Sequence, residues 1–260
     1  MALQIDFEGR VAVVTGGGKG VGRGITERFL EAGADVVICG RSEPESMPAA
    51  GGRTPTFVAA DVRDLEHIDR VVQAATERFG RLDVLVNNAG GAPYADAATV
   101  SPRFSEKILA LNLNAALHFA QRANAVMQAQ ADGGSIVNIA SVSGIRPSPG
   151  TAAYGAAKAG LLSLTQTLAV EWAPKVRVNA VTAGMIRTEQ AHLHYGDEAA
   201  LARIAATVPL GRFGTPQDVG DVCVFLASPL ASYVSGASLL VHGGGEPPPF
   251  HEAAREPDRR

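Results

Sequence analysis

The stretch SVSGIRPSPGTAAYGAAK carries a hydroxyl, a phenol and an ammonium at Ser141, Tyr154 and Lys158. Tyr154 and Lys158 are four positions apart in an Ala-rich segment, so on a helix their side chains leave the same face. A positive charge within about 4–6 Å favours the phenolate and lowers the pKa of a tyrosine below its ordinary value of about 10. Such a phenol can exchange a proton near neutral pH as a general acid or base.

Ser141 follows the apolar run from Ile136 to Ile139, which is typical of the carboxyl end of a buried strand. Open α/β sheets bind their ligands at that end, so the three polar groups could meet at one substrate oxygen. The same pattern also fits an ordinary helix aromatic, a solvated lysine and a turn serine, because Tyr and Lys pairs at this spacing arise by chance. The rest of the chain decides between these two interpretations.

The composition is that of an ordinary globular protein, with 260 residues, 46% of them hydrophobic, and a net charge of −3. This length fits one large domain, and there is no basic excess to attract nucleic acid or an anionic membrane. Asp6 and Glu8 stand where a signal peptide would be basic and then apolar, and no apolar run is long enough to span a bilayer. The two cysteines do not suggest a disulfide framework. We therefore expect a cytoplasmic protein that binds neither nucleic acid nor membrane.

Short apolar runs alternate with longer amphipathic stretches, a pattern typical of repeated β-α units. Helical periodicity ends at Gly33 and again at Gly80. The sequence predicts an α/β protein with a Rossmann-like, doubly wound, seven-stranded parallel sheet and helices on both faces. The predicted strands are Val11 to Thr15, Asp35 to Cys39, Thr56 to Ala60, Leu82 to Val86, Ser135 to Ala140, Val176 to Val181 and Ser238 to Val241.

Two segments depart from this alternation. Residues 42–55 contain three prolines and two glycines, which leaves no room for a helix after the second strand. Residues 246–260 are Pro-rich and charged, as in an extended tail. We expect one domain over residues 1–245, followed by a tail that could lie on a neighbouring subunit.

A glycine-rich turn, TGGGKGVG, follows the first predicted strand and precedes a helical pattern. Gly16, Gly20 and Gly22 form GxxxGxG, a spacing that lets the backbone turn sharply and approach a pyrophosphate held by helix N–H groups. The GxGxxG form of other Rossmann dehydrogenases is absent, because Arg23 and Ile25 stand where its third glycine would be. Most glycine-rich turns bind nothing, but strand, loop and helix in this order favour a dinucleotide site.

Arg41 follows the second predicted strand, close to where an NAD-specific site usually has an acidic residue for the ribose hydroxyl. Its guanidinium could bind a 2′-phosphate, and Lys19 in the glycine loop offers a second positive charge. Both residues favour NADP(H); if they are only solvated surface charges, NAD(H) is the alternative. Asp61, after the third strand, is the expected acceptor for the adenine amine. It could instead cap the next helix, a role that suits Asp64 better.

With these motifs in place, the sequence resembles the short-chain dehydrogenase/reductase family, in its single-domain branch with TGxxxGxG and YxxxK motifs. The resemblance covers nearly the whole chain. Its elements stand in family order, as TGGGKGVG, Asp61-Val62, Asn87-Asn88-Ala89-Gly90, Asn112, Ser141, Tyr154 and Lys158. Several ordered motifs are far more specific than YxxxK alone, which favours the catalytic interpretation.

The resemblance implies that Tyr154 is the catalytic acid/base, that Ser141 positions the substrate oxygen, and that Lys158 supports the phenol and binds the cofactor ribose. Asn112 would anchor a chain of water molecules that relays the proton to solvent. The implied enzyme is an NADP(H)-dependent oxidoreductase that interconverts a secondary alcohol and a ketone by hydride transfer. An NAD-dependent alcohol, sugar or steroid dehydrogenase of the same family is the alternative. The expected cofactor-binding residues are Gly16, Lys19, Gly20, Val21, Gly22, Arg41, Asp61, Val62, Asn88, Ala89, Gly90, Tyr154, Lys158, Gly184, Ile186 and Thr188.

The chain departs from the family pattern at three places. Ala183 stands where a proline usually precedes Gly184, which we expect to loosen the turn beside the nicotinamide. His242 stands where an aspartate usually precedes paired glycines, and the usual helix after the second strand is missing. These departures leave the chemistry intact but put in doubt any narrow label, such as an acyl-carrier-protein ketoreductase.

Substrate choice in such folds lies in loops beyond the strand ends, here residues 91–100, 143–151 and 185–208. His192 and His194 could bind a metal, but no third ligand stands nearby at metal spacing, so we expect an exposed lid helix and no metal. Helical stretches around residues 105–129 and 151–173 are rich in small side chains, which favours close pairing of subunits in a homodimer or homotetramer.

Two functions outside the dehydrogenases fit less well. A non-catalytic dinucleotide sensor would not need Ser141, Tyr154 and Lys158 together. A sugar-nucleotide epimerase would resemble the longer enzymes that have a GxxGxxG loop and a larger C-terminal domain. We therefore expect a small carbonyl or alcohol compound as the substrate.

Overall fold

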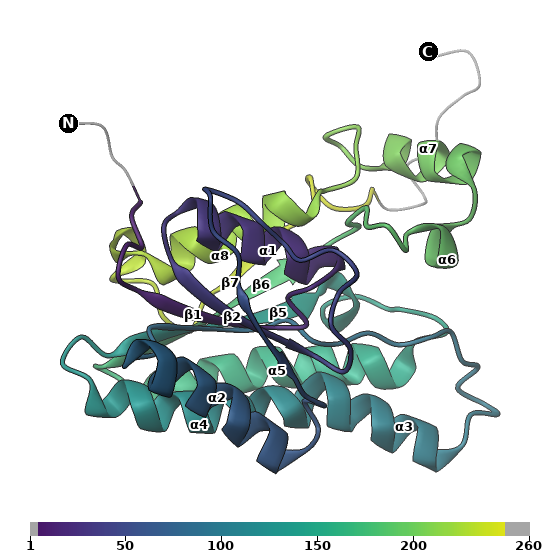
Figure 1. Cartoon of the computed structure of the whole chain (residues 1–260). Helices are drawn as coiled ribbons and strands as arrows, with labels where there is room; N and C mark the ends of the chain where they lie inside the picture. The colour runs from purple at the N-terminus through teal and green to yellow at the C-terminus, as the bar shows by residue number, and fades with distance from the viewer. Residues whose placement is uncertain (1–4, 248–260) are drawn as a thin grey trace.

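The computed structural model describes residues 5–247, apart from the side chains of Leu193 and His194. Its centre is one sheet of seven parallel strands in the order β3-β2-β1-β4-β5-β6-β7 (Figure 1). The strands are β1 Val11–Thr15, β2 Asp35–Gly40, β3 Thr56–Ala59, β4 Val84–Asn87, β5 Gly134–Ser141, β6 Val176–Ala183 and β7 Ser238–Val241. The strand order reverses between β1 and β4, which is the point where such sheets bind ligands.

Both faces of the sheet are covered, which is why its strands are apolar throughout. All five residues of β1 are buried, and they alternate between the two faces. Val11 and Val13 belong to one apolar core, and Ala12 and Val14 belong to the other. The predicted doubly wound α/β fold is therefore confirmed.

The helices form a layer on each side of the sheet (Figure 1). On one face lie α1 Gly20–Glu31 and α8 Pro216–Ala227, and on the other α2 Leu65–Phe79, α4 Ala115–Ala129 and α5 Ala152–Glu171. The remaining helical segments are α3 Pro102–Leu109, a π-helical turn Ala110–Asn114, the 3₁₀ turns Val142–Gly144 and Pro229–Ala231, α6 His192–Tyr195 and α7 Glu198–Thr207. None of the described helices is both long enough and apolar enough to cross a membrane.

All seven predicted strands are present, half of their boundaries are exact, and the others shift by one or two residues. The fourth strand shows why one boundary shifts. It was expected from Leu82 but begins at Val84, because the Leu82 N–H donates to the Gln130 side chain at 2.8 Å instead of to a neighbouring strand. The fifth and sixth strands are longer than predicted and end at Ser141 and Ala183. Both longer strands carry the chain directly into the candidate site.

The segment between β2 and β3 has no helix, as its prolines predict. It is held by an isolated bridge between Ala50 and Arg53, and by Arg23, whose side chain donates to the Ser46 carbonyl oxygen at 2.9 Å. Asp64 caps α2 by accepting hydrogen bonds from the backbone of Glu66 and His67, so Asp61 is free of that role. Of the predicted tail, residues 248–260 lie outside the described residues.

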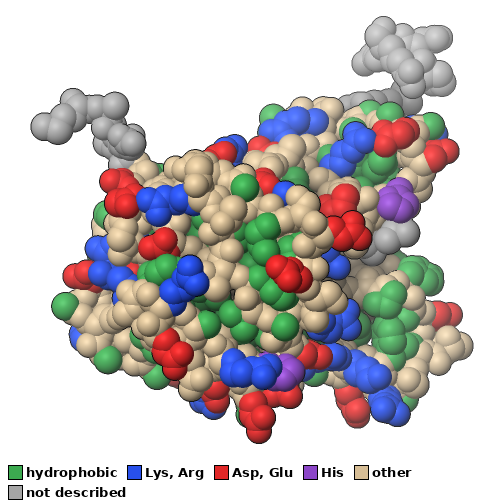
Figure 2. Space-filling model, in the orientation of Figure 1, with side chains coloured by type: hydrophobic (Ala, Val, Ile, Leu, Met, Phe, Trp, Pro, Cys, Tyr) green, Lys and Arg blue, Asp and Glu red, His purple; other side chains and the backbone are tan. Residues whose placement is uncertain are grey.

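The segment after β6 forms a small lobe at one end of the sheet, seen with α6 and α7 in Figure 1. It has its own apolar cluster around Ala191, Leu201 and Phe213. Figure 2 shows that basic and acidic side chains are interspersed over the visible face, with no large area of one sign. This charge distribution fits the expectation of a small-molecule substrate better than that of a nucleic acid.

Candidate active site

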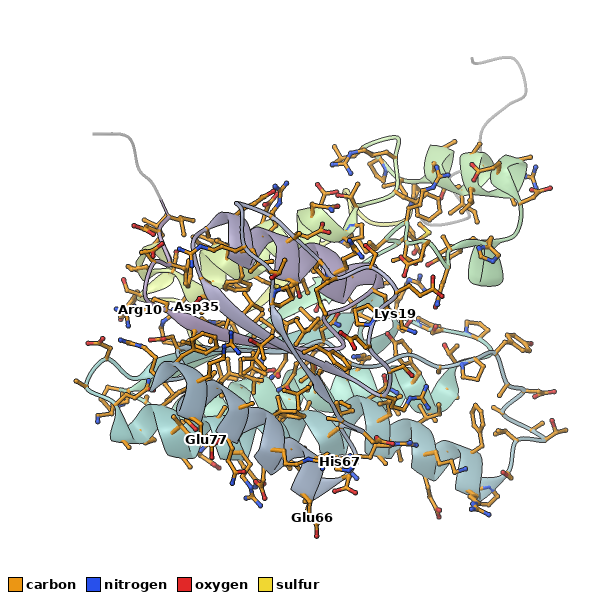
Figure 3. The ribbon with its side chains drawn as sticks, in the orientation of Figure 1. Arg10, Lys19, Asp35, Glu66, His67 and Glu77 are labelled. Atoms are coloured by element: carbon orange, nitrogen blue, oxygen red, sulfur yellow. The ribbon has the colours of Figure 1, made fainter. Side chains whose placement is uncertain are left out.

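The expected functional residues come together at the carboxyl ends of the central strands. Lys19 lies at this end of the sheet, whereas Arg10 and Asp35 lie at the other (Figure 3). The groups that gather here are the glycine loop after β1, residues 88–91 after β4, Ser141 at the end of β5, and residues 184–189 after β6.

The glycine loop needs glycine for two different physical reasons. Gly16 and Gly20 have φ angles of 65° and 54°, a left-handed conformation that other residues rarely adopt. A Cβ on Gly22 would lie 2.2 Å from the carbonyl oxygen of Gly16, so only glycine lets α1 start against the loop. These constraints explain the GxxxGxG spacing and leave the backbone exposed to a ligand at the α1 N-terminus.

Thr15 ties the glycine loop to the segment after β4. Its hydroxyl oxygen accepts hydrogen bonds from the N–H groups of Asn88 and Ala89, both at 2.9 Å. The Asn88 side chain in turn donates to the Thr15 carbonyl oxygen at 2.8 Å. The two segments expected to hold the same cofactor are therefore joined into one wall.

Val21 lies partly buried at the start of α1, and Val62 is buried in the core.

Asn112 lies within the π-helical turn between α3 and α4, a feature that the sequence did not predict. Its side-chain amide donates to the Ile108 carbonyl oxygen at 2.9 Å, four residues back, and to the Gly91 carbonyl oxygen at 3.0 Å. Its oxygen accepts from the Gly91 N–H at 2.7 Å. The side chain is therefore committed to holding the loop at Gly91, and Gly90 beside it has no room for a Cβ, which would lie 2.6 Å from the Asn112 oxygen.

Two glycines bring Ser141 close to Tyr154 and Lys158. The 3₁₀ turn after β5 packs on the start of α5, where a Cβ on Gly144 would lie 2.8 Å from Lys158 and one on Gly155 2.8 Å from the Ser143 oxygen. Ser141 caps this turn by accepting from the Ser143 N–H at 3.2 Å. The backbone contact is close enough for a hydrogen bond between the hydroxyls of Ser141 and Tyr154.

Lys158 is almost completely buried, with 4% of its surface exposed. Its ammonium donates to the Ile139 carbonyl oxygen at 2.7 Å and lies 5.5 Å from the centroid of the Tyr154 ring. Burial lowers the pKa of Lys158 to about 8, because the charged form is poorly solvated there. Lys158 is therefore not the solvated surface lysine of the alternative interpretation.

The direction of the Tyr154 pKa differs from the predicted one. Burial raises the pKa of this phenol, the hydrogen bond with Ser141 acts in the opposite direction with less effect, and Tyr195 adds a further increase. The spacing in the sequence places a positive charge near the ring, but it does not reveal how much water the phenol loses. At neutral pH the phenol is therefore protonated.

The expected adenosine side contains an arginine that the sequence analysis did not single out. The Asp61 carboxylate pairs with the side chain and backbone of Arg63, with Nε at 2.9 Å. Hydrogen bonds from Arg63, with a smaller contribution from Arg41, lower the pKa of Asp61 to about 2. No ion pair among the described residues includes Arg41 or Lys19, and both are exposed.

A carboxylate occupies the N-terminus of α1. Glu189, from the segment after β6, accepts a hydrogen bond from the Gly20 N–H at 3.0 Å, and Thr188 lies next to Gly20. The N-terminus of α1 therefore binds one anionic group within the chain itself, which is compatible with the expected phosphate site. Gly184 packs against His242, and the buried Ile186 bridges to Gly214, so both expected residues fix the start of this segment.

A cavity of about 130 Å³ opens beside Tyr154, between the loop after β4, α3 and the start of α5. Its walls are mostly small and apolar, and they include Ala92, Pro93, Ala95, Ala97, Val100, Phe104, Ile108, Gly150, Ala152 and Ala153. Two of the three loops expected to choose the substrate contribute to it. The third carries Tyr195, whose ring packs on Phe213 at 5.3 Å and whose hydroxyl influences Tyr154 electrostatically.

The possible metal site at His192 finds no support in the described side chains. Among them, no group of three or more His, Cys, Asp or Glu residues is close enough together to hold a metal ion. His192 is exposed at the start of α6, and the side chain of His194 lies outside the described part of the chain.

Comparisons with known proteins agree with this geometry. A family model described as enoyl-(acyl carrier protein) reductase matches residues 16–246. The chain is 39% identical over 245 residues to L-rhamnose 1-dehydrogenase (NAD(P)(+)) of Azotobacter vinelandii, covering 90% of this chain and 96% of the relative. It is 36% identical over 242 residues to 2-dehydro-3-deoxy-D-gluconate 5-dehydrogenase of Escherichia coli, covering 92% and 96%. The solved structure of aldohexose dehydrogenase from Thermoplasma acidophilum has a TM-score of 0.86 and 29% identity, and 98% of each chain is covered.

Proposed function

Because the chain belongs to the short-chain dehydrogenase/reductase family and is an oxidoreductase that acts on CH–OH or C=O groups, we propose that it interconverts a secondary alcohol and a ketone with NADP(H). Tyr154 is the acid/base in this proposal, and Asn112, Ser141 and Lys158 are its partners. The observation that carries it is the convergence of Ser141, Tyr154 and Lys158 beside a glycine loop that already holds a carboxylate.

Tyr154 is set up to deliver a proton. Because burial raises its pKa, the phenol keeps its proton at neutral pH and can donate it to a ketone oxygen as that oxygen gains negative charge. Ser141 would hold the same oxygen through a second hydrogen bond. The phenolate that remains is stabilised by the Lys158 ammonium, 5.5 Å from the ring, until a proton returns from solvent.

Asn112 supports the site by fixing its wall. Its three hydrogen bonds to the backbone of Ile108 and Gly91 hold the segment after β4 close to Lys158. We retain the hypothesis that a water chain passes this residue, since its oxygen has a lone pair beyond the one that Gly91 uses.

The residues of the expected cofactor set would contact four parts of the dinucleotide. Gly16, Gly20 and Gly22 would hold the pyrophosphate through the α1 N-terminus, and Asn88 to Gly90 would form the wall beside the adenosine. Lys158 would bind the ribose, while Gly184, Ile186 and Thr188 would line the nicotinamide side. A bound nicotinamide dinucleotide supplies or accepts the hydride that the protein cannot provide.

Arg41 and Lys19 support the choice of NADP(H). Both are exposed cations, so neither must break an ion pair among the described residues to bind a 2′-phosphate. Asp61 would repel such a phosphate, but Arg63 balances its charge. The pair leaves the Asp61 carboxylate in place to accept a hydrogen bond from the adenine amine. NAD(H) is the alternative outcome of the cofactor measurement below.

The outer face of α5 supports a homotetramer or homodimer. Its exposed side chains include Ala152, Ala156, Ala159, Ser163 and Val170, and Val170 is 80% exposed. Small uncharged side chains let two helices approach closely, so a second copy of α5 fits this face. Light scattering on the purified protein gives the number of subunits.

Turnover and cofactor binding test the proposed chemistry separately. With a panel of ketones and NADPH, the Tyr154→Phe variant should lose activity by about 10²- to 10⁴-fold, the usual contribution of a general acid. Fluorescence titration should give it the same Kd for NADPH as the unaltered protein. Binding of NADPH by the unaltered protein without reduction of any ketone in the panel would favour the alternative of a dinucleotide sensor.

A further inference from the structure

The cavity beside Tyr154 is enclosed by the segments that hold the candidate catalytic residues. Tyr154 is itself part of the wall, together with Gly150 and Ile108. The Ala95 N–H donates to the Gly150 carbonyl oxygen at 2.8 Å, which joins the loop after β4 to the loop after β5. The Ile108 carbonyl oxygen accepts from the Asn112 side chain at 2.9 Å. The cavity therefore adjoins the reacting centre through its own walls.

A chain of hydroxyl groups fixes the loop after β5. The Ser148 hydroxyl lies 3.0 Å from that of Ser143 and 2.7 Å from that of Thr151. Thr151 donates its proton to the Ser148 carbonyl oxygen at 3.1 Å. Thr151 lines the cavity, but its one proton is used within the loop and is not offered to a ligand.

Hydrogen-bonding side chains are scarce on the cavity walls. None of the described residues that line it is charged, and their side-chain hydroxyls are those of Ser105, Thr151 and Tyr154. The other wall residues are Ala, Gly, Pro, Val, Ile and Phe. A ligand with several hydroxyl groups would leave most of them without a partner here, and each would weaken binding by about five- to a hundredfold.

An exposed aromatic side chain extends the apolar wall. Tyr94 stands between Pro93 and Ala95, which both line the cavity, and it is 80% exposed. Its ring packs on Gly150, where a Cβ would overlap the ring. The ring and the cavity together form a continuous apolar surface, which is typical of a ligand-binding site.

We propose that this cavity holds an alkyl chain of the substrate, so that the preferred substrates are short-chain alkyl ketones and the matching alcohols, not sugars. This inference rests on the proposed oxidoreductase function and narrows its substrate class. The hydride from the cofactor and the proton from Tyr154 convert C=O to CH–OH as before, and the alkyl chain takes no part in the reaction.

The size of the cavity limits the length of the chain. Its volume of about 130 Å³ is slightly below that of an apolar cavity of about 150 Å³ that binds benzene. By this comparison it holds about five carbon atoms. Each methylene that enters an apolar site adds about fourfold to binding, so the chain length of the substrate should be visible in the kinetics.

The first test measures kcat/KM along the series from 2-butanone to 2-nonanone, whose longer arm grows from ethyl to heptyl. The readout is consumption of NADPH or NADH, whichever cofactor the protein binds more tightly. The kcat/KM should rise by up to about fourfold for each methylene until 2-heptanone, and should not rise further. An equal kcat/KM along the series, or a rise that continues unchanged to 2-nonanone, would overturn the proposal.

The second test compares an apolar alcohol with sugars in the oxidative direction. The kcat/KM for 2-heptanol should exceed that for L-rhamnose and that for D-glucose by about tenfold or more, because the sugar hydroxyls find few partners on the walls. Better oxidation of either sugar than of 2-heptanol contradicts the proposed substrate class.

Two wall residues allow the cavity to be changed in opposite directions. Phe104→Ala removes a ring from the wall and should move the best substrate to a chain longer than that of 2-heptanone. Ala95→Leu fills part of the space and should lower kcat/KM for 2-heptanone about tenfold or more, while 2-butanone stays within about twofold. A failure of the two variants to shift the preferred length in opposite directions counts against the cavity.

The matched control is Arg103→Ala. Arg103 is the exposed neighbour of Phe104 on α3 and is not among the described residues that line the cavity. Its loss should leave the order of the ketones unchanged. If Arg103→Ala shifts the preferred length as Phe104→Ala does, the shift comes from α3 as a whole and the proposal is overturned.

Binding to the protein without cofactor separates this proposal from the proposed function. Ligand-observed NMR should give a lower Kd for 2-heptanone than for 2-butanone, and Ala95→Leu should weaken 2-heptanone more. This pattern supports the alkyl site even where no ketone is turned over and the proposed function fails. Turnover without chain-length dependence and without this binding overturns the alkyl site and leaves the oxidoreductase function standing.

Discussion

The ammonium of Lys158 lies 5.5 Å from the centroid of the Tyr154 ring and donates its hydrogen bond to the Ile139 carbonyl oxygen. It therefore acts on the phenol as a buried charge over the ring. The same burial that raises the pKa of Tyr154 lowers that of Lys158 to about 8. The pair holds one buried positive charge at neutral pH, which supports a phenolate but opposes folding.

Replacing this charge should stabilise the protein. The pKa of Lys158 is 10.5 before burial and about 8 in the folded chain, a difference equivalent to about 3 kcal/mol. Between these two pH values the unfolded chain binds more protons than the folded one, so the contribution of Lys158 to the free energy of unfolding rises with pH. Below about pH 8 the lysine is charged in both states, and the full cost of burying its charge is present. Lys158→Met should therefore unfold at higher urea than the unaltered protein at neutral pH. The advantage should shrink at higher pH, and turnover should be lost.

The matched control is Lys107→Met, which removes an exposed lysine from α3. Its urea midpoint should stay close to that of the unaltered protein at every pH. A Lys158→Met variant that is less stable at neutral pH would mean that the hydrogen bond to Ile139 outweighs the cost of the buried charge.

Gly22→Ala should damage the glycine loop. Its Cβ would lie 2.2 Å from the Gly16 oxygen and 2.5 Å from the Asn88 side chain, so the start of α1 must move. Thermal unfolding should show a loss of about 1–3 kcal/mol, as for an overpacked core, together with weaker NADPH binding. Gly18→Ala is the control, since the nearest atoms to its Cβ belong to the Pro44 side chain, at 3.1 Å or more. Equal loss in both variants would point to backbone flexibility instead of this contact.

The residues that could be predicted from the sequence are those whose constraints are local. The Val-rich β1 is recognisable because a strand buried on both faces has no polar side, and Gly16, Gly20 and Gly22 are recognisable because φ and close packing demand glycine. The Tyr154 and Lys158 pair followed from helical spacing. These features lie within a few positions of one another, so their pattern carries the information.

The contacts that were missed join exposed residues far apart in the chain. Glu189 reaches Gly20 over 169 positions, and Glu246 reaches Arg146 over 100. A charged side chain has many chemically equivalent partners, so no spacing selects one of them. The direction of the Tyr154 pKa was predicted wrongly for a related reason, because desolvation depends on what the whole fold packs around the hydroxyl.

Arg41→Ala should change the choice of cofactor. Arg41 is exposed beside Asp61, so its loss should weaken NADPH by about tenfold or more and leave NADH nearly unchanged, in fluorescence titrations at low salt. Raising the salt concentration should reduce the difference. Arg70→Ala, which removes an exposed arginine on α2, should affect neither cofactor. Equal weakening of NADPH and NADH by Arg41→Ala would contradict the 2′-phosphate contact and favour the NAD alternative.

Glu189→Gln should strengthen cofactor binding. The Glu189 carboxylate accepts the Gly20 N–H at 3.0 Å, at the helix N-terminus where the cofactor pyrophosphate would bind. An anion there gains about 0.3–1 kcal/mol from the helix dipole, and it must be displaced before a phosphate can bind. Gln keeps the size of the side chain but removes the charge, so the Kd for NADPH should fall by about two- to fivefold.

The control for this exchange is Glu198→Gln. Glu198 is an exposed acid in the first turn of α7 that pairs with Arg187, so its loss changes the charge of the same lobe by the same amount. Its Kd for NADPH should stay within about twofold of that of the unaltered protein. Glu198 would act on the cofactor only by long-range electrostatics, which dissolved salt screens. If Glu189→Gln raises the Kd instead, Glu189 holds the segment after β6 over the cofactor. In that case the hydrogen bond between Glu189 and Gly20 is part of the cofactor-bound conformation, and Glu189 does not compete with the cofactor.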